Sequence, residues 1–210
     1  KSSITLDLAA RYSRGWSMPP DAGCSEVRNP GNVLIFAAED PVDSVVAPRL
    51  IAADADMSRI SVFESIEHDD GTEDLPRLPS NAAAFEAEIV EKEIGLVIVD
   101  VLNCFTDPGL NAYVDTDCRK ITTPLAKIAE RNNCAILFLR HLNKSTGQSA
   151  AHRGGGSMAL LGAARVGWLA GQHPDDDEAK VLCCTKSNLA QRPQSIAYNI
   201  EKARNGNPRI

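Results

Sequence analysis

Three apolar segments of the sequence each stop at an ionisable residue. The run "NVLIFAAE" ends in Glu39, "IGLVIVD" ends in Asp100, and "CAILFLRH" ends in His141. Unbroken apolar runs of this length are typical of strands in a parallel sheet, which is covered on both faces. Because ligands bind at the carboxyl ends of such strands, we expect the three side chains to lie together at a nucleotide-binding edge.

The segment "LVIVD" has the form of a Walker B motif, four apolar residues followed by an aspartate. In that motif the carboxylate holds Mg²⁺ beside the phosphates of a nucleotide. Glu39, at the end of a neighbouring strand, would then orient or deprotonate the water that attacks the γ-phosphate. Two alternatives stay open: Asp100 only caps the following turn, and Glu39 is only stabilised by the dipole of the next helix.

The first two residues match the end of a second phosphate-binding motif. The Walker A form is G-x-x-x-x-G-K-[ST] at the start of a helix, and here Lys1-Ser2 leads into an amphipathic segment at 3–14. Lys1 would reach the β- and γ-phosphates, and Ser2 would bind Mg²⁺. The glycines of the motif are not in the sequence, so we expect one core over residues 1–210, truncated within or just after Walker A. An ordinary helix start is the alternative.

Helices alternate with the strands along the chain. The apolar spacing predicts helices at 3–14, 41–53, 81–92 and 112–131, the last burying Val114, Cys118, Ile121, Leu125 and Ile128. Strands are expected at 32–39, 59–65, 94–100, 134–141, 164–170, 179–187 and 195–202, with polar loops at 68–80 and 143–157. This order predicts an α/β fold: a doubly wound, mostly parallel sheet flanked by helices, with a β-rich C-terminal extension.

Composition limits the class of protein. The 210 residues carry a net charge of −6, with 43% hydrophobic and 24% charged residues, as expected for one sizeable α/β domain. The negative charge argues against coating of nucleic acid by bulk charge but allows a local basic groove. No apolar run approaches the roughly 20 residues that span a bilayer, so we expect no membrane partner. The six cysteines form no C-x-x-C pair, which favours reduced core thiols in a cytoplasmic protein.

Six segments follow one another in a specific order: "KSS" before a helix, "FAAEDPVDSVVAPRL", "LVIVDVLNCF", "ILFLRHLNKSTG", "HRGGGSMALLGAARVGW" and "CTKSNLAQRP". Together they resemble the RecA-like, AAA-type ATPase domain of the plasmid hexameric replicative helicases (the RepA-like family) and of their phage and bacterial relatives. The resemblance covers nearly the whole chain, and the order of the segments is more specific than any one of them.

The resemblance implies roles at the nucleotide. Glu39 is implied as the catalytic glutamate and His141 as the sensor of the γ-phosphate. Arg49 is expected to stack on the adenine. The residues implied to bind ATP are Lys1, Ser2, Ser3, Asp40, Arg49 and Asp100, with Ser2 and Asp100 as the ligands of Mg²⁺.

The resemblance also implies roles between subunits and toward DNA. Arg165 corresponds to the arginine finger that reaches into a neighbouring subunit, and Lys186 to a second cation acting in trans. Lys144 and Arg153 belong to a loop expected to line the channel of a ring and to bind single-stranded DNA. Asn188 stands where some ring helicases place an arginine, which leaves the finger role to Arg165.

Each of these residues also has a plainer interpretation. His141 could pair with a backbone carbonyl at a strand end, Arg165 could be a surface arginine, and Lys186 a solvated lysine. The glycine run after Arg153 could simply allow a tight backbone path at a subunit contact.

The function expected from the sequence is Mg²⁺-dependent ATP hydrolysis that drives translocation along DNA in a hexameric, helicase-like ring. Two alternatives remain: a RecA-like recombination or regulatory ATPase without helicase activity, and a nucleotide-binding scaffold without turnover.

Overall fold

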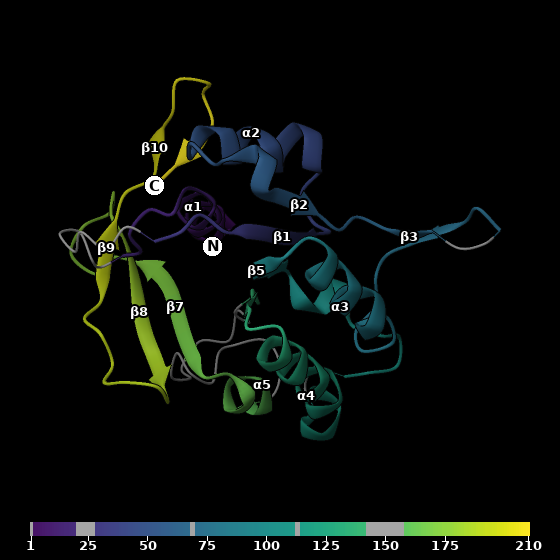
Figure 1. Cartoon of the computed structure of the whole chain (residues 1–210). Helices are drawn as coiled ribbons and strands as arrows, with labels where there is room; N and C mark the ends of the chain where they lie inside the picture. The colour runs from purple at the N-terminus through teal and green to yellow at the C-terminus, as the bar shows by residue number, and fades with distance from the viewer. Residues whose placement is uncertain (1, 20–27, 68–69, 112–113, 142–157) are drawn as a thin grey trace.

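The structure is a computed structural model, and it describes residues 2–19, 28–67, 70–111, 114–141 and 158–210. A sheet of four parallel strands in the order β2-β1-β5-β6 runs through its centre (Figure 1). Its strands are β1 (Asn32–Ala37), β2 (Ile60–Val62), β5 (Ile94–Asp100) and β6 (Ala135–Phe138). All four lie inside the predicted segments, so the expected parallel sheet is confirmed.

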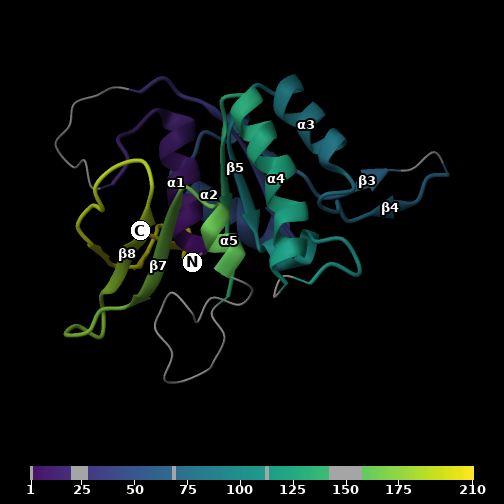
Figure 2. The same cartoon turned by 90° about the horizontal axis from the view of Figure 1, so that it is seen from below.

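Helices cover both faces of this sheet (Figures 1 and 2). One face carries α1 (Ser2–Arg14) and α2 (Ala47–Ala52), and the other carries α3 (Ala82–Glu91) and α4 (Asp115–Arg131). The doubly wound arrangement expected from the alternation of strands and helices is therefore confirmed.

The two hydrophobic clusters follow the alternation of side chains along the strands. On β1, Val33 and Ile35 pack with the α1 side, while Leu34 and Phe36 pack with the α3 and α4 side. The Phe36 ring meets three other phenylalanine rings edge-on, at centroid distances of 5.0 to 5.3 Å. Edge-to-face contacts of this kind add to the burial of apolar area and fix how the helices sit on the sheet.

The expected buried face of the helix at 112–131 is correct except at its start. Cys118, Ile121, Leu125 and Ile128 are all at most 2% exposed. Val114 is 42% exposed, because the helix begins only at Asp115 and Val114 stands before its first turn in an extended conformation.

Several connections contain more structure than the sequence predicted. A π-helical turn (Val42–Val46) precedes α2, and short 3₁₀ helices span Met57–Arg59 and Leu102–Phe105. The acidic segment expected as a plain loop at 68–80 takes part in a small antiparallel pair, β3 (Ile66–Glu67) with β4 (Glu73–Asp74).

The C-terminal part is rich in strands, as expected. After α5 (Met158–Ala163), the strands β7 (Val166–Gln172), β8 (Lys180–Ser187) and β9 (Ile196–Tyr198) form an antiparallel sheet beside the central one (Figure 1). The single strand expected at 195–202 is divided into β9 and β10 (Glu201–Lys202), and β10 pairs with β11 (Pro208–Arg209).

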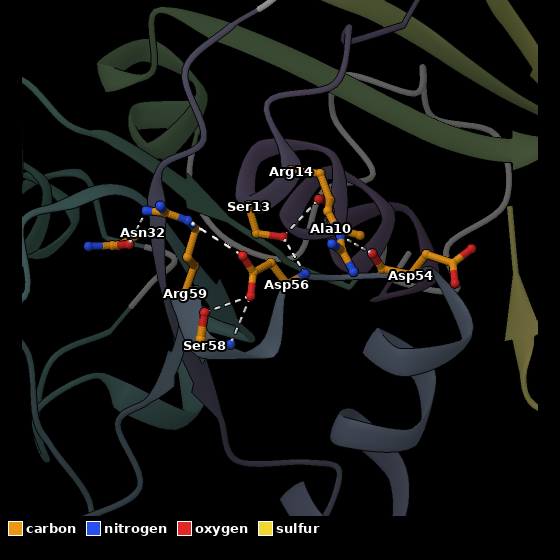
Figure 3. Close-up of polar contacts among 8 residues, drawn as sticks. All are labelled: Ala10, Ser13, Arg14, Asn32, Asp54, Asp56, Ser58 and Arg59. Atoms are coloured by element: carbon orange, nitrogen blue, oxygen red, sulfur yellow. Dashed lines mark hydrogen bonds and ion pairs between the residues drawn. The ribbon is translucent and has the colours of Figure 1, made fainter.

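A polar network fixes the end of α1 to the rest of the domain (Figure 3). The fully buried Ser13 hydroxyl donates to the carbonyl of Ala10 (2.8 Å) and accepts from the backbone N–H of Asp56 (2.9 Å). The Asp56 carboxylate lies 3.6 Å from Arg59, which also donates to Asn32 at the start of β1 (3.2 Å). Buried groups that have all found partners hold this end of α1 in place.

In the part of the chain that the structure describes, no helix combines the length and the apolar character needed to cross a bilayer.

Candidate active site

A small cavity opens at the carboxyl ends of β1 and β5, where the N-terminus of α1 meets the segment after β1. The residues that line it are Ser2, Thr5, Leu6, Ile35, Ala37, Glu39, Asp40, Val46, Ile98 and Asp100. The sheet register aligns Ala37 of β1 with Asp100 of β5, so the residues after both strands reach the same edge. Four of the residues predicted from the sequence, Ser2, Glu39, Asp40 and Asp100, therefore share one cavity.

Asp100 is the last residue of β5 and one of its carboxylate oxygens is unpartnered. Its carbonyl accepts a hydrogen bond from the N–H of Ala38 (3.4 Å), which ties the ends of the two strands together. The Oδ1 atom is buried and has no hydrogen-bond partner among the residues that the structure describes. Leaving a buried carboxylate oxygen without a partner is costly, so this atom points to a ligand that the protein alone does not supply.

Ser2 begins α1 at the edge of this cavity. Its carbonyl accepts a hydrogen bond from the Thr5 hydroxyl (3.0 Å), one turn along the helix. Leu6 and Ala9 are buried against the sheet and fix which face of α1 it covers. Ser3, also predicted to bind the nucleotide, is half-buried but does not line the cavity.

Glu39 and His141 are in direct contact, although 102 positions separate them. The Nε2 atom of His141 lies 3.1 Å and 3.2 Å from the two carboxylate oxygens of Glu39. Both side chains are accessible, 45% exposed for Glu39 and 58% for His141. A carboxylate held by a histidine but open to solvent can still accept a proton from a water molecule.

Asp40 and Arg49 form an ion pair beside this contact. The Nη1 atom of Arg49 donates to Asp40 at 2.9 Å, which joins α2 to the segment that follows β1. The stacking of Arg49 on an adenine stays a prediction, and in the structure its guanidinium is engaged by the carboxylate.

Arg165 and Lys186 lie outside the cavity lining, on the antiparallel sheet. Arg165 immediately precedes β7 and is exposed, and its guanidinium has no hydrogen bond or ion pair to any residue that the structure describes. The Nζ atom of Lys186 donates to three carbonyls, those of Leu161, Gly162 and Ala164, each at 2.7 Å.

Three predicted residues lie outside the described part of the chain: Lys1 at the nucleotide, and Lys144 and Arg153 in the loop expected to bind DNA.

Sequence reasoning did not single out Thr5, Cys104 or Arg140. Thr5 lies three positions after Ser2, and this helical spacing is the signal that could have found it. Burial, and next the negative charge of Glu39, raise the pKa of the Cys104 thiol, which keeps it protonated beside the site. Arg140 lies next to His141, and burial lowers the pKa of its guanidinium; neither Cys104 nor Arg140 has a sequence pattern that marks it.

The fold and the cavity at its carboxyl edge define a RecA-like nucleotide-binding domain. A solved ATPase domain of another protein is similar in structure, with a TM-score of 0.65 at 12% identity over 100% of this chain and 80% of that chain. The RadB recombinase is similar with a TM-score of 0.52 at 12% identity, over 84% of this chain and 77% of that one. At this identity the likeness shows the shared fold.

The chain belongs to the AAA domain family (AAA_25), whose model matches residues 1–147. This range contains Ser2, Glu39, Asp100 and His141, whereas Arg165 and Lys186 lie beyond it. No curated protein matches the sequence. The class expected from the sequence, a RecA-like ATPase domain of the AAA type, is confirmed.

Proposed function

We propose that this chain hydrolyses ATP in a Mg²⁺-dependent reaction, as the motor domain of a hexameric helicase that moves along single-stranded DNA. The observation that carries the proposal is the unpartnered Oδ1 atom of Asp100 in a cavity shared with Ser2 and Glu39. Membership of the AAA domain family supports the nucleotide as the ligand.

The residues of the cavity fit a magnesium nucleotide. Mg²⁺ prefers oxygen ligands, and the Ser2 hydroxyl and the Asp100 carboxylate are oxygen donors that line the same cavity. When bound, the ion would neutralise charge on the phosphates of ATP. The buried, unpartnered Oδ1 atom of Asp100 is the donor best suited to hold it.

Glu39 would act on the water molecule. Its carboxylate stands at the same edge and is accessible, so it can orient the water and accept its proton as the bond to the γ-phosphate breaks. The contact with His141 would hold the carboxylate in place and would carry changes at Glu39 to the chain that follows β6. That chain includes Lys144 and Arg153, the residues proposed to contact DNA.

Arg165 would complete the site of a neighbouring copy. Its side chain is exposed and has no partner among the described residues, so the guanidinium is available to a second chain. An arginine finger contributes about 10³ to 10⁵ in rate in other phosphoryl-transfer proteins. An isolated protomer should therefore hydrolyse ATP slowly, and assembly into a ring should accelerate it.

A second candidate is a recombination or regulatory ATPase, which the structural likeness to the RadB recombinase favours. A strand-displacement assay separates the two, because only the helicase releases an annealed strand as it hydrolyses ATP.

The proposal is tested by ATP hydrolysis of the full-length protein, with and without single-stranded DNA. We expect stimulation by DNA in the wild type. Asp100→Asn should abolish turnover and weaken nucleotide binding in the presence of Mg²⁺, because the charge facing the ion is lost.

Asp107→Asn is the matched control. Asp107 also has a buried oxygen without a partner, while its other oxygen accepts from the backbone and hydroxyl of Ser80, and it does not line the cavity. This variant should keep its turnover. Wild-type hydrolysis by Asp100→Asn, or equal loss in both variants, would contradict the assignment of the site.

A further inference from the structure

The ammonium group of Lys186 closes the C-terminal end of α5. Its three hydrogen-bond partners at 2.7 Å are the carbonyls of Leu161, Gly162 and Ala164, which lie in the last turn of the helix or just after it. An ammonium has three donors, so these contacts use all of them. The last carbonyls of a helix have no partner within the helix and carry partial negative charge, so a lysine at this position stabilises the helix end.

The packing around Gly167 makes this contact possible. Gly167 on β7 is paired with Lys186 on β8. A Cβ atom at Gly167 would stand 2.6 Å from Leu161 Cδ1, which is closer than two carbon atoms can approach, and 3.4 Å from Lys186 Cβ. The missing side chain lets α5 lie directly against the hairpin, within reach of the lysine.

The same contacts fix the backbone on both sides of Arg165. The carbonyl of Ala164, just before it, is held by Lys186, and its own carbonyl accepts from the N–H of Asn188 (2.9 Å). Within α5, Leu160 is packed into the core cluster that includes Ile121 of α4. The base of Arg165 is thus connected to the core, while its side chain stays exposed.

We infer that Lys186 is a positioning residue: it holds the turn between α5 and β7 and so fixes the point from which Arg165 reaches out, instead of contacting the nucleotide of a neighbouring copy itself. A functional side chain acts best when the backbone that carries it is rigid. The inference rests on the proposed role of Arg165 for its effect on turnover, but not for the contact itself.

The contact is tested first in the free protein, by hydrogen–deuterium exchange of peptides that cover 158–170. Lys186→Met keeps the length of the side chain and removes the charge and all three donors. We expect the amides of this turn to exchange roughly 10- to 100-fold faster, because hydrogen bonds to a charged group are lost. Lys186→Arg, which restores charge and donors, should recover part of the protection.

Lys180→Met is the matched control, because Lys180 is on the same strand and donates to the side chain of Gln172 at the far end of the hairpin (2.6 Å). It should leave exchange at 158–170 unchanged. Unchanged exchange in Lys186→Met would overturn the inference, whatever its turnover.

Turnover of the assembled protein then separates positioning from direct contact. If Lys186 acts through Arg165, the double variant Arg165→Ala with Lys186→Met should be no slower than Arg165→Ala alone. Independent, multiplying losses would instead mean that Lys186 contacts the nucleotide. If Arg165→Ala itself has no effect on turnover, the proposed finger fails, while the exchange experiment still decides the contact.

Discussion

At the scale of single residues, the contact between Glu39 and His141 couples two ends of the sheet. The carboxylate follows β1 and the imidazole follows β6, with β5 between the two strands. Both side chains are at the surface, so neither contributes much to the hydrophobic core. Changes at Glu39 should therefore act on chemistry and leave the fold intact.

Glu39→Gln should lower the rate of ATP hydrolysis by about 10² to 10⁴, the usual contribution of a positioned acid–base group. The amide keeps the shape of the side chain and can still pair with His141, but it cannot accept a proton from water. Nucleotide affinity should stay close to that of the wild type. Single-turnover hydrolysis and binding of a fluorescent ATP analogue measure the two quantities separately.

Glu64→Gln controls for the loss of a carboxylate near the same edge. Glu64 follows β2, the neighbour of β1, is exposed, and does not line the cavity. It should turn over like the wild type. If Glu39→Gln does so as well, the chain is a nucleotide-binding domain in which this carboxylate has no catalytic part.

The residues of the cavity could be predicted from the sequence because strands impose a simple rule. A buried apolar run ends where its first ionisable residue appears, and parallel strands bring such ends to one edge, which located Glu39, Asp100 and His141. The partners of Lys186 could not be predicted, because the carbonyls of Leu161 and Gly162 look like those of any other residue. That contact depends on how α5 packs on a hairpin, which no local pattern encodes.

At the scale of elements, the position of α1 depends on two glycines beneath it. The ring of Tyr12 lies over Gly31, before β1, and over Gly95 in β5. A Cβ atom at either glycine would overlap the Tyr12 ring or its hydroxyl. Since α1 carries Ser2 at its other end, this packing also sets where Ser2 meets the cavity.

Gly95→Ala should lower the free energy of unfolding by about 1–3 kcal/mol, the usual cost of an extra methyl group in a packed site. The new methyl group would collide with the Tyr12 hydroxyl, the nearest of the atoms around it. The midpoint of urea denaturation, followed by circular dichroism, measures the loss.

Two further variants identify the cause. Tyr12→Phe removes the atom that the methyl group meets, so the double variant should recover part of the lost stability. Gly171→Ala, in β7, has nothing within 4 Å of the added carbon and should be close to neutral. Equal losses at Gly95 and Gly171 would mean that the contact with Tyr12 is not the reason.

Elements with a clear period were predictable, and those defined by backbone detail were not. The spacing of Phe85 and Ile89 located α3, whose first and last residues are within one position of the expected ends. The π-helical turn before α2 and the pairing of Ile66 with Asp74 depend on hydrogen bonds between backbone groups, which side-chain types describe poorly.

At the scale of the whole molecule, acidic groups outnumber basic ones, and several of them hold elements together. The net charge is −6 and the isoelectric point is near 5.2. Glu86 of α3 accepts from Arg131 (2.6 and 3.0 Å) and Asn132 (2.9 Å) at the end of α4, so a carboxylate joins two helices on one face of the sheet. These hydrogen bonds, first those of Arg131 and then that of Asn132, hold the pKa of Glu86 below its ordinary value of 4.5.

This lowered pKa predicts how the stability of the domain depends on pH. A carboxylate whose pKa falls on folding contributes stability above its unfolded value, and the contribution is lost as the pH falls through the folded value. Glu86→Gln should therefore be less stable than the wild type at pH 7, and the difference should shrink below about pH 4.5. Urea denaturation midpoints from pH 7 to pH 3 measure it, at low protein concentration because the net charge passes through zero near pH 5.2. Glu91→Gln is the control on the same helix, since the Glu91 carboxylate is exposed and bonded to none of the described residues. A difference between Glu86→Gln and wild type that stays constant down to pH 3 would mean that shape, and not charge, joins α3 to α4.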